Sequence, residues 1–275
     1  MFDCHIHTKN SHDSTQTLSQ VCESAIAMGM KGIAICDHVD LCSAERHDTY
    51  HAMQRCIAEV KEARLQYGDR LRILQGMELA GVEFNPSMRD PFMQLCDYDV
   101  ILGSVHTVYL EDVDDSYSRV DWSVGEKSME RIRAFFAAYL KSMREMLARD
   151  DIDVLSHLTC PLRYINGKYR RGLDEREFYE EIDEILREII RREIALEANT
   201  SGAGRSYGDW LPSRAILTRY YELGGRMITL GSDAHIPESI GNAFEEACEM
   251  LREIGFREIC YFAERKPIFI GLEEK

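Results

Sequence analysis

The sequence predicts an α/β protein whose strands and helices alternate along the chain and close into a single TIM-like barrel. Short apolar runs alternate with longer amphipathic segments, which indicates βαβ units and a parallel sheet. The chain has 275 residues, close to the ~250 that such barrels usually need. No Ser/Gly/Pro-rich linker or shift in composition divides it, so we expect one domain over residues 1–275.

The periodicity of apolar residues predicts the individual elements. Seven runs are expected to be barrel strands: 2–7, 32–38, 72–79, 99–106, 153–157, 194–199 and 227–233. A further run, 258–262, is either an eighth strand or an edge piece. Six segments are expected to be helices: 18–28, 44–66, 125–148, 174–192, 212–223 and 243–254. The acidic segment 110–122 and the glycine-containing segment 164–172 are predicted to be active-site loops.

Composition limits the classes of function. The formal net charge is −15, and the chain lacks the basic stripe that binds long nucleic acids, although an acidic chain can bind an anionic substrate through cations and a few arginines. The nine cysteines are scattered without a Cys-x-x-Cys pair, which favours reduced core thiols over disulfides. The N-terminus lacks a signal-peptide pattern, and no apolar run approaches the ~20 residues of a membrane span. We therefore expect a cytoplasmic protein with no membrane partner.

Most predicted strands end in a side chain of a metal-binding type. His5 and His7 lie two residues apart near the end of the first strand, so both point to the same side of the sheet. The other strand-end residues are His38, Glu78, His106, His157, Asp233 and His235. Each one alone is more simply a hydrogen-bonded or surface residue, but chance does not explain the repetition. Because the carboxyl ends of barrel strands meet on one face, we predict at least two ions of zinc, iron or manganese there, with Glu78 as a bridge between them.

These residues, in this order, resemble the polymerase-and-histidinol-phosphatase (PHP) superfamily over nearly the whole chain. The matching motifs are Asp3-x-His5-x-His7-Thr8 with Ser11-x-Asp13-Ser14, Asp37-His38, Gly76-x-Glu78, Gly103-Ser104-Val105-His106, Ser156-His157 and Gly231-Ser232-Asp233-Ala234-His235. The stretch Leu196-Glu197-Ala198-Asn199-Thr200-Ser201-Gly202 is similar to the histidinol-phosphatase branch. The resemblance implies a distorted (β/α)7 barrel that holds a trinuclear divalent metal centre.

The resemblance also implies the residues of the site. The first ion would bind His5, His7, Glu78 and Asp233; the second Glu78, His106 and His157; the third Asp13, His38 and His235, with His12 as the alternative to Asp13. Arg163 and Arg205 best match the family's arginines for the substrate phosphate, which a planar guanidinium can bind through two oxygens. The spacing before Arg205 and the loop 158–162 depart from the family pattern, which leaves the substrate open.

The implied activity is a phosphomonoesterase, above all one for L-histidinol phosphate in histidine biosynthesis. Either Asp233 or water at the metal centre would protonate the leaving group, and the acidic segment 111–115 could contact the substrate amine. Three alternatives stay open. One is a phosphodiesterase, exonuclease or phosphatase that acts on nucleotides or another small phosphate ester. The others are an amidohydrolase, whose barrel also starts with His-x-His, and a non-catalytic barrel with structural metals. The oligomeric state is not predicted.

Overall fold

A parallel sheet forms the centre of the computed structural model, which describes residues 1–42, 48–110, 116–149, 151–204 and 206–272. Its strands follow the order β1-β2-β4-β5-β6-β7-β8. They are β1 (Phe2–Ile6), β2 (Gly32–Ile35), β4 (Arg72–Ala80), β5 (Val100–Ser104), β6 (Val154–Leu155), β7 (Ala195–Asn199) and β8 (Ile228–Gly231). The first and last strands approach each other at a parallel bridge between Ile6 and Ala234. The sheet is therefore a nearly closed seven-stranded barrel, as predicted.

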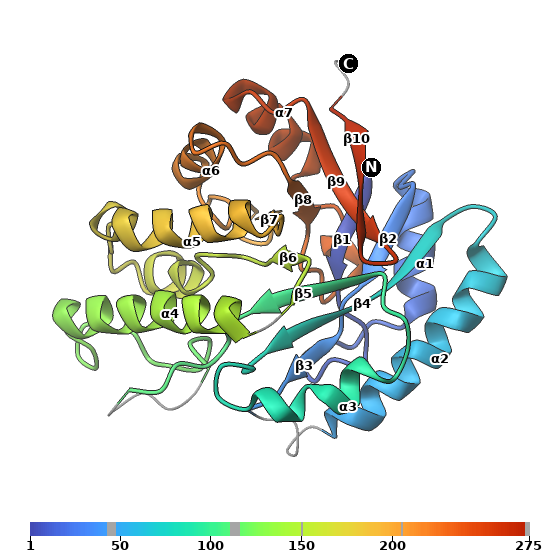
Figure 1. Cartoon of the computed structure of the whole chain (residues 1–275), viewed down its shortest axis with the longest axis horizontal. Helices are drawn as coiled ribbons and strands as arrows, with labels where there is room; N and C mark the ends of the chain where they lie inside the picture. Colours follow the sequence, from blue (N-terminus) through green and yellow to red (C-terminus); the bar gives the residue numbers. More distant parts are fainter. Residues whose placement is uncertain (43–47, 111–115, 150, 205, 273–275) are drawn as a thin grey trace.

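Helices surround the barrel (Figure 1). The six predicted ones are α1 (Leu18–Ala27), α2 (Thr49–Tyr67), α4 (Met129–Arg149), α5 (Tyr179–Arg191), α6 (Arg214–Glu222) and α7 (Phe244–Ile254). Local chemistry fixes their starts: the Thr17 side chain accepts from Gln20 N–H in a capping box before α1, and Ser213 caps α6. The predicted start of α2 at residue 44 lies outside the described residues. A one-turn helix, α3 (Asp90–Met93), was not predicted.

Each strand buries both of its faces, because one face meets the helices and the other fills the barrel. Alternate residues along the strands, such as Ile33 and Ile35, belong to the large cluster that the helices cover. The intervening residues, such as Cys4, Ala34 and Leu74, form a second cluster. Seven of the nine cysteines are buried in the structure.

The run 258–262 is not an eighth barrel strand. It forms β9 (Glu258–Ala263), which pairs with β10 (Lys266–Gly271) in a separate antiparallel hairpin. Side chains of β9 join the second apolar cluster, and the Tyr261 ring stacks on Phe2 with 3.9 Å between centroids. Since Phe2 begins β1, the hairpin covers the amino-terminal end of the barrel (Figure 1), opposite the predicted site.

Two further predictions need correction. The run 32–38 is split into β2 and a short strand β3 (His38–Asp40), because the chain leaves the sheet at Asp37, whose carboxylate accepts from Thr8 N–H and Thr8 Oγ1 at 2.6 and 2.7 Å. The predicted loop 164–172 begins with a π-helical segment, Arg163–Lys168. Among the residues described, none of the helices has both the length and the apolarity to cross a membrane.

Candidate metal centre

The carboxyl ends of the strands surround a cavity of about 220 Å³. Its lining includes Arg163 and seven of the predicted ligands: Asp13, His38, Glu78, His106, His157, Asp233 and His235. His5 and His7 are fully buried beside them. The structure thus brings the predicted strand-end residues together in one basin, because parallel strands present the same end to the same face.

The first predicted group lies at the bottom of this basin. The Nε2 atoms of His5 and His7 are 3.0 Å apart, and each is 3.5 Å from Glu78 Oε2. Asp233 Oδ1 lies 3.3 Å from His7 Nε2 and 4.0 Å from His5 Nε2. Four donor atoms from β1, β4 and the end of β8 therefore face one small volume.

The second group uses the other oxygen of the same glutamate. Glu78 Oε1 lies 2.7 Å from His157 Nε2 and 3.1 Å from His106 Nε2. Because the two oxygens of Glu78 face different pairs of histidines, this side chain has the geometry of a bridge between two sites.

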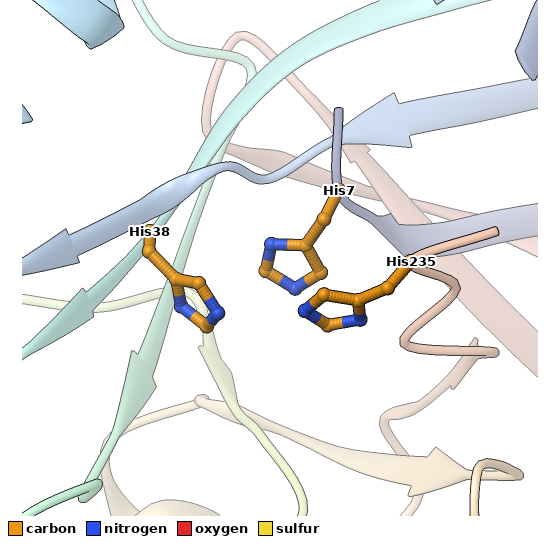
Figure 2. A group of neighbouring side chains, drawn as sticks. All are labelled: His7, His38 and His235. Atoms are coloured by element: carbon orange, nitrogen blue, oxygen red, sulfur yellow. The ribbon is translucent and has the colours of Figure 1, made fainter. Parts of the chain in front are cut away.

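The third group lies nearer the opening of the cavity. Asp13 Oδ1 is 3.4 Å from His38 Nε2 and 3.3 Å from His235 Nε2. Figure 2 shows the imidazoles of His7, His38 and His235 converging; His7 follows β1, His38 begins β3 and His235 lies after β8. The rings of His12 and His38 are 5.3 Å apart between centroids, so His12 is also near this group.

Donor-atom distances define overlapping candidate metal groups. In the part of the chain that the structure describes, four triads have donor atoms within 4.8 Å of one another: His5-His7-Asp233, His5-Glu78-His157, His7-His38-His235 and His38-Asp40-His106. The last contains Asp40, which was not among the predicted site residues. Imidazole and carboxylate donors are suited to zinc, iron and manganese.

Two of the predicted ligands have an unusual backbone conformation. His157 has a φ of 24° and Asp233 a φ of 52°, a region that side chains other than glycine rarely adopt. Asp233 N–H donates to His5 O at 2.9 Å, and His157 N–H donates to Glu197 Oε2 at 2.8 Å. These hydrogen bonds hold a backbone conformation that turns both side chains into the basin.

The carboxylates of the basin are held in their charged form. Burial would raise the pKa of Glu78, but His106 and His5 outweigh it and hold that pKa well below its usual range. Burial likewise opposes the ionisation of Asp233, and the hydrogen bond with His7 keeps its pKa well below the ordinary value. Ionised carboxylates are the form that binds metal ions.

Unsatisfied buried atoms support a metal at this position. Glu78 Oε2, His38 Nδ1 and His235 Nε2 are buried, and none has a partner in hydrogen-bond geometry among the described residues. Glu78 Oε2 and His38 Nδ1 are only 2.8 Å apart, so the atoms face one another without bonding well. Since buried polar atoms normally find partners, these residues fit a bound cation.

A second layer of residues orients the imidazoles. His106 Nδ1 is 2.7 Å from Asp40 Oδ1, and His5 Nδ1 is 2.7 Å from Glu197 Oε1. His7 Nδ1 is 2.9 Å from Ser11 Oγ, which belongs to the first sequence motif. Asp40 and Glu197 were not predicted as site residues, although Glu197 is recognisable as a lone acidic residue within a buried strand.

Of the two predicted phosphate-binding arginines, Arg163 is placed at the site. Its Nη1 donates to Ser201 Oγ at 2.6 Å and to Asp233 Oδ2 at 3.3 Å, and its Nη2 donates to Tyr164 Oη at 3.1 Å. The guanidinium thus lies beside the first group and faces the cavity. Arg205 and the acidic segment 111–115 lie outside the described residues. Residues 116–119, which belong to the predicted active-site loop 110–122, line the cavity.

Comparison with known proteins identifies the family. The PHP domain model matches residues 3–201. A probable histidinol-phosphatase of Clostridium acetobutylicum is 31% identical over 96% of this chain and 98% of its own length, and the histidinol-phosphatase of Lactococcus lactis subsp. lactis is 25% identical over 96% and 95%. The solved structure of histidinol phosphate phosphatase from that lactococcus, complexed with zinc, L-histidinol and phosphate, superposes with a TM-score of 0.73 at 22% identity, covering 97% of this chain and 98% of the other. The chain belongs to the PHP-domain family, in its histidinol-phosphatase-like branch.

Proposed function

We propose that this protein is a metal-dependent phosphomonoesterase that hydrolyses L-histidinol phosphate to L-histidinol and phosphate in histidine biosynthesis. The observation that carries the proposal is the guanidinium of Arg163 beside Asp233, at the edge of the three ligand groups. An ester phosphate needs cationic partners for its oxygens. Arg163 would supply one, and ions held by the ligand groups would supply the others from a second direction. The identity with histidinol-phosphatases over nearly the full length supports the choice of substrate.

We infer that three divalent ions, of zinc, iron or manganese, occupy the groups described above. His5, His7, Glu78 and Asp233 would hold the first; Glu78, His106 and His157 the second; Asp13, His38 and His235 the third. When bound, such ions lower the pKa of water toward about 7 and stabilise negative charge on phosphate oxygens. The position of Asp13 between His38 and His235 supports Asp13 rather than His12 as the remaining ligand of the third ion.

The protein's own residues would bind and orient the ester. Arg163 is held by Ser201 and Tyr164, so its fork is already oriented before a phosphate arrives. The low pKa of Asp233 leaves it without a proton near neutral pH, so it suits a ligand better than an acid, and water would supply the proton for the leaving alkoxide. The cavity of about 220 Å³ suits a small phosphate ester. We also propose a cytoplasmic location for the protein.

Phosphate release from L-histidinol phosphate tests the proposal. The metal-loaded protein is compared with an EDTA-treated sample and with His157→Ala, on this ester and on a panel of other phosphomonoesters and short oligonucleotides. We expect EDTA-sensitive turnover with the highest kcat/KM on L-histidinol phosphate, and a loss of at least 100-fold in His157→Ala. A higher kcat/KM on a nucleotide or another ester would keep a hydrolase at this site and reject the proposed substrate.

The same assay tests the arginines. Arg163→Ala should lower kcat/KM by roughly 100-fold or more, about 3 kcal/mol, since it removes two charge-assisted hydrogen bonds to the phosphate. Arg163→Lys should restore little, because a lysine cannot reproduce the planar fork. Arg205→Ala tests the second predicted arginine. Arg191→Ala is the matched control, as Arg191 pairs with Glu188 at the far end of α5. An Arg163→Ala enzyme with unchanged KM and kcat would refute the phosphate-binding role.

A further inference from the structure

Glu197 is a buried acidic residue that none of the ligand groups uses. It lies at the centre of β7, between Leu196 and Ala198, in a strand that is buried along its whole length. Its carboxylate points toward the bottom of the metal basin, because both of its oxygens contact residues there. Burying a carboxylate is costly unless it is well hydrogen-bonded, so its contacts indicate what it does.

Three nitrogen atoms surround this carboxylate. Oε1 lies 2.7 Å from His5 Nδ1, and Oε2 accepts from His157 N–H at 2.8 Å and from Asn199 Nδ2 at 3.0 Å. An ionised carboxylate can only accept, so His5 Nδ1 must carry a proton for the first contact to be a hydrogen bond. A neutral imidazole with its proton on Nδ1 has its lone pair on Nε2.

That lone pair is aimed at the first metal group. His5 Nε2 lies 3.0 Å from His7 Nε2 and 3.5 Å from Glu78 Oε2. The other oxygen of Glu197 acts on the second group, because it binds the peptide N–H of His157, whose φ of 24° is unfavourable for an L residue. His157 Nε2 in turn lies 2.7 Å from Glu78 Oε1. One carboxylate therefore fixes two histidines that face the two oxygens of Glu78.

Gly231 makes room for this arrangement. A Cβ at position 231 would lie 2.0 Å from Glu197 Oε1 and 2.7 Å from His5 Cβ, closer than real Cβ contacts come. The glycine of the motif Gly231-Ser232-Asp233 is thus required by the position of the carboxylate and not by its own backbone conformation.

We propose that Glu197 is a positioning residue of the metal centre, which holds His5 in the tautomer that offers Nε2 to the first ion and holds the strained backbone of His157 for the second. The inference rests on the proposed function only in so far as metal ions bind here. The role of Glu197 concerns metal binding, so its test does not depend on which phosphate ester the protein hydrolyses. Partners of this kind typically change metal affinity by about 10- to 100-fold when they are removed.

Glu197→Gln is the informative variant because it keeps the shape of the side chain. A glutamine has one oxygen and one NH2, so it cannot accept from both His5 Nδ1–H and His157 N–H. We expect zinc affinity, measured by competition with a chelator, to fall at least 10-fold for one or more ions. Asp183→Asn is the matched control: Asp183 is also buried, but it pairs with Arg219 on the outer helices. Its zinc affinity should equal that of the wild type.

A second measurement is made on the wild-type protein, and a variant serves only to assign its signal. In zinc-loaded wild-type protein labelled with ¹⁵N-histidine, the His5 ring should show a protonated Nδ1 and a metal-bound Nε2, with the Nδ1 proton protected from exchange. The signal is assigned by its loss in His5→Gln. Unchanged zinc affinity in Glu197→Gln, or a His5 ring that binds zinc through Nδ1, would overturn the proposal. Phosphatase activity enters neither measurement, so failure of the proposed substrate would leave this result intact.

Discussion

Single residues outside the metal centre also carry a cost of burial, and Glu83 is the clearest case. This side chain follows β4 and is 4% exposed, and neither carboxylate oxygen has a hydrogen-bond partner among the described residues. Burial raises the pKa of Glu83 from 4.5 to about 7. Between about pH 4.5 and 7, the folded protein therefore keeps a proton on Glu83 that the unfolded chain has released. The free energy of unfolding consequently decreases as the pH rises through that window.

Glu83→Gln should therefore stabilise the protein at high pH and not at low pH. The expected gain in the free energy of unfolding is close to zero near pH 4.5 and grows to about 3 kcal/mol at pH 8. Urea denaturation of the variant and the wild type at both pH values measures it. Glu62→Gln, at an exposed position of α2, is the control and should change little. A gain that is the same at both pH values would contradict this account.

Residue by residue, the side chains that converge in the basin were easier to predict than the residues that hydrogen-bond to them. A ligand of a barrel site follows a strand, so its position is visible as a histidine or acid at the end of an apolar run. Glu197 and Asp40 contact His5 and His106 across an intervening strand, β8 in the first case and β4 in the second, at distances of 2.7 Å that depend on register and not on sequence spacing. A single sequence does not contain that information.

At the scale of elements, α5 contributes to the stability of the fold and supplies no residue of the metal basin. Ile182, Ile185, Leu186 and Ile189 recur at helical spacing and are all fully buried on its inner face. Leu186→Ala should lower the free energy of unfolding by about 2–5 kcal/mol, through lost burial and the cavity that remains. Zinc stoichiometry should stay as in the wild type, because the ligands come from the opposite, strand-end side of the sheet. The measurements are urea denaturation and metal analysis of the folded protein.

An exposed position on the same helix provides the comparison. Arg187→Ala removes a side chain that is 60% exposed and should change stability by less than about 1 kcal/mol. If Leu186→Ala lost its metal while still folded, the helix layer would be coupled to the site, contrary to this view.

The elements that were predicted best are those in which the periodic apolar residues of the sequence are the residues that pack into the core. All seven barrel strands and six helices carry such a pattern, and their observed bounds lie within a few residues of the predicted ones. The exceptions are the start of α5, which a 3-10 segment over Glu175–Phe178 precedes, and the start predicted at residue 44, which lies outside the described residues. The break between β2 and β3 was missed because a hydrogen bond from Thr8 to Asp37 draws the chain out of the sheet. The hairpin of β9 and β10 was missed because the apolar residues of β9 indicate burial in either arrangement.

For the whole molecule, the metal basin and the second apolar cluster occupy opposite ends of the barrel. The second apolar cluster, closed by β9, fills the amino-terminal end, whereas six imidazoles and the carboxylates of Asp13, Glu78 and Asp233 crowd the other. Without cations, buried groups such as Glu78 Oε2 stay unsatisfied, which destabilises only that end. The core should therefore keep the metal-free chain folded, at reduced stability.

Removal of metal should therefore lower the melting temperature without unfolding the protein at 25 °C. An ion present at 100 times its Kd stabilises the native state by about 2.7 kcal/mol, which corresponds to roughly 5–10 °C for a domain of this size. EDTA treatment should lower the Tm by at least this amount and leave the far-UV circular dichroism at 25 °C unchanged, and added zinc should restore the Tm. His157→Ala should lose only part of the effect, because it removes a ligand of one group and leaves the other two. An EDTA-treated protein that is free of metal yet melts with the untreated one would show that the basin binds cations too weakly to be a metal centre.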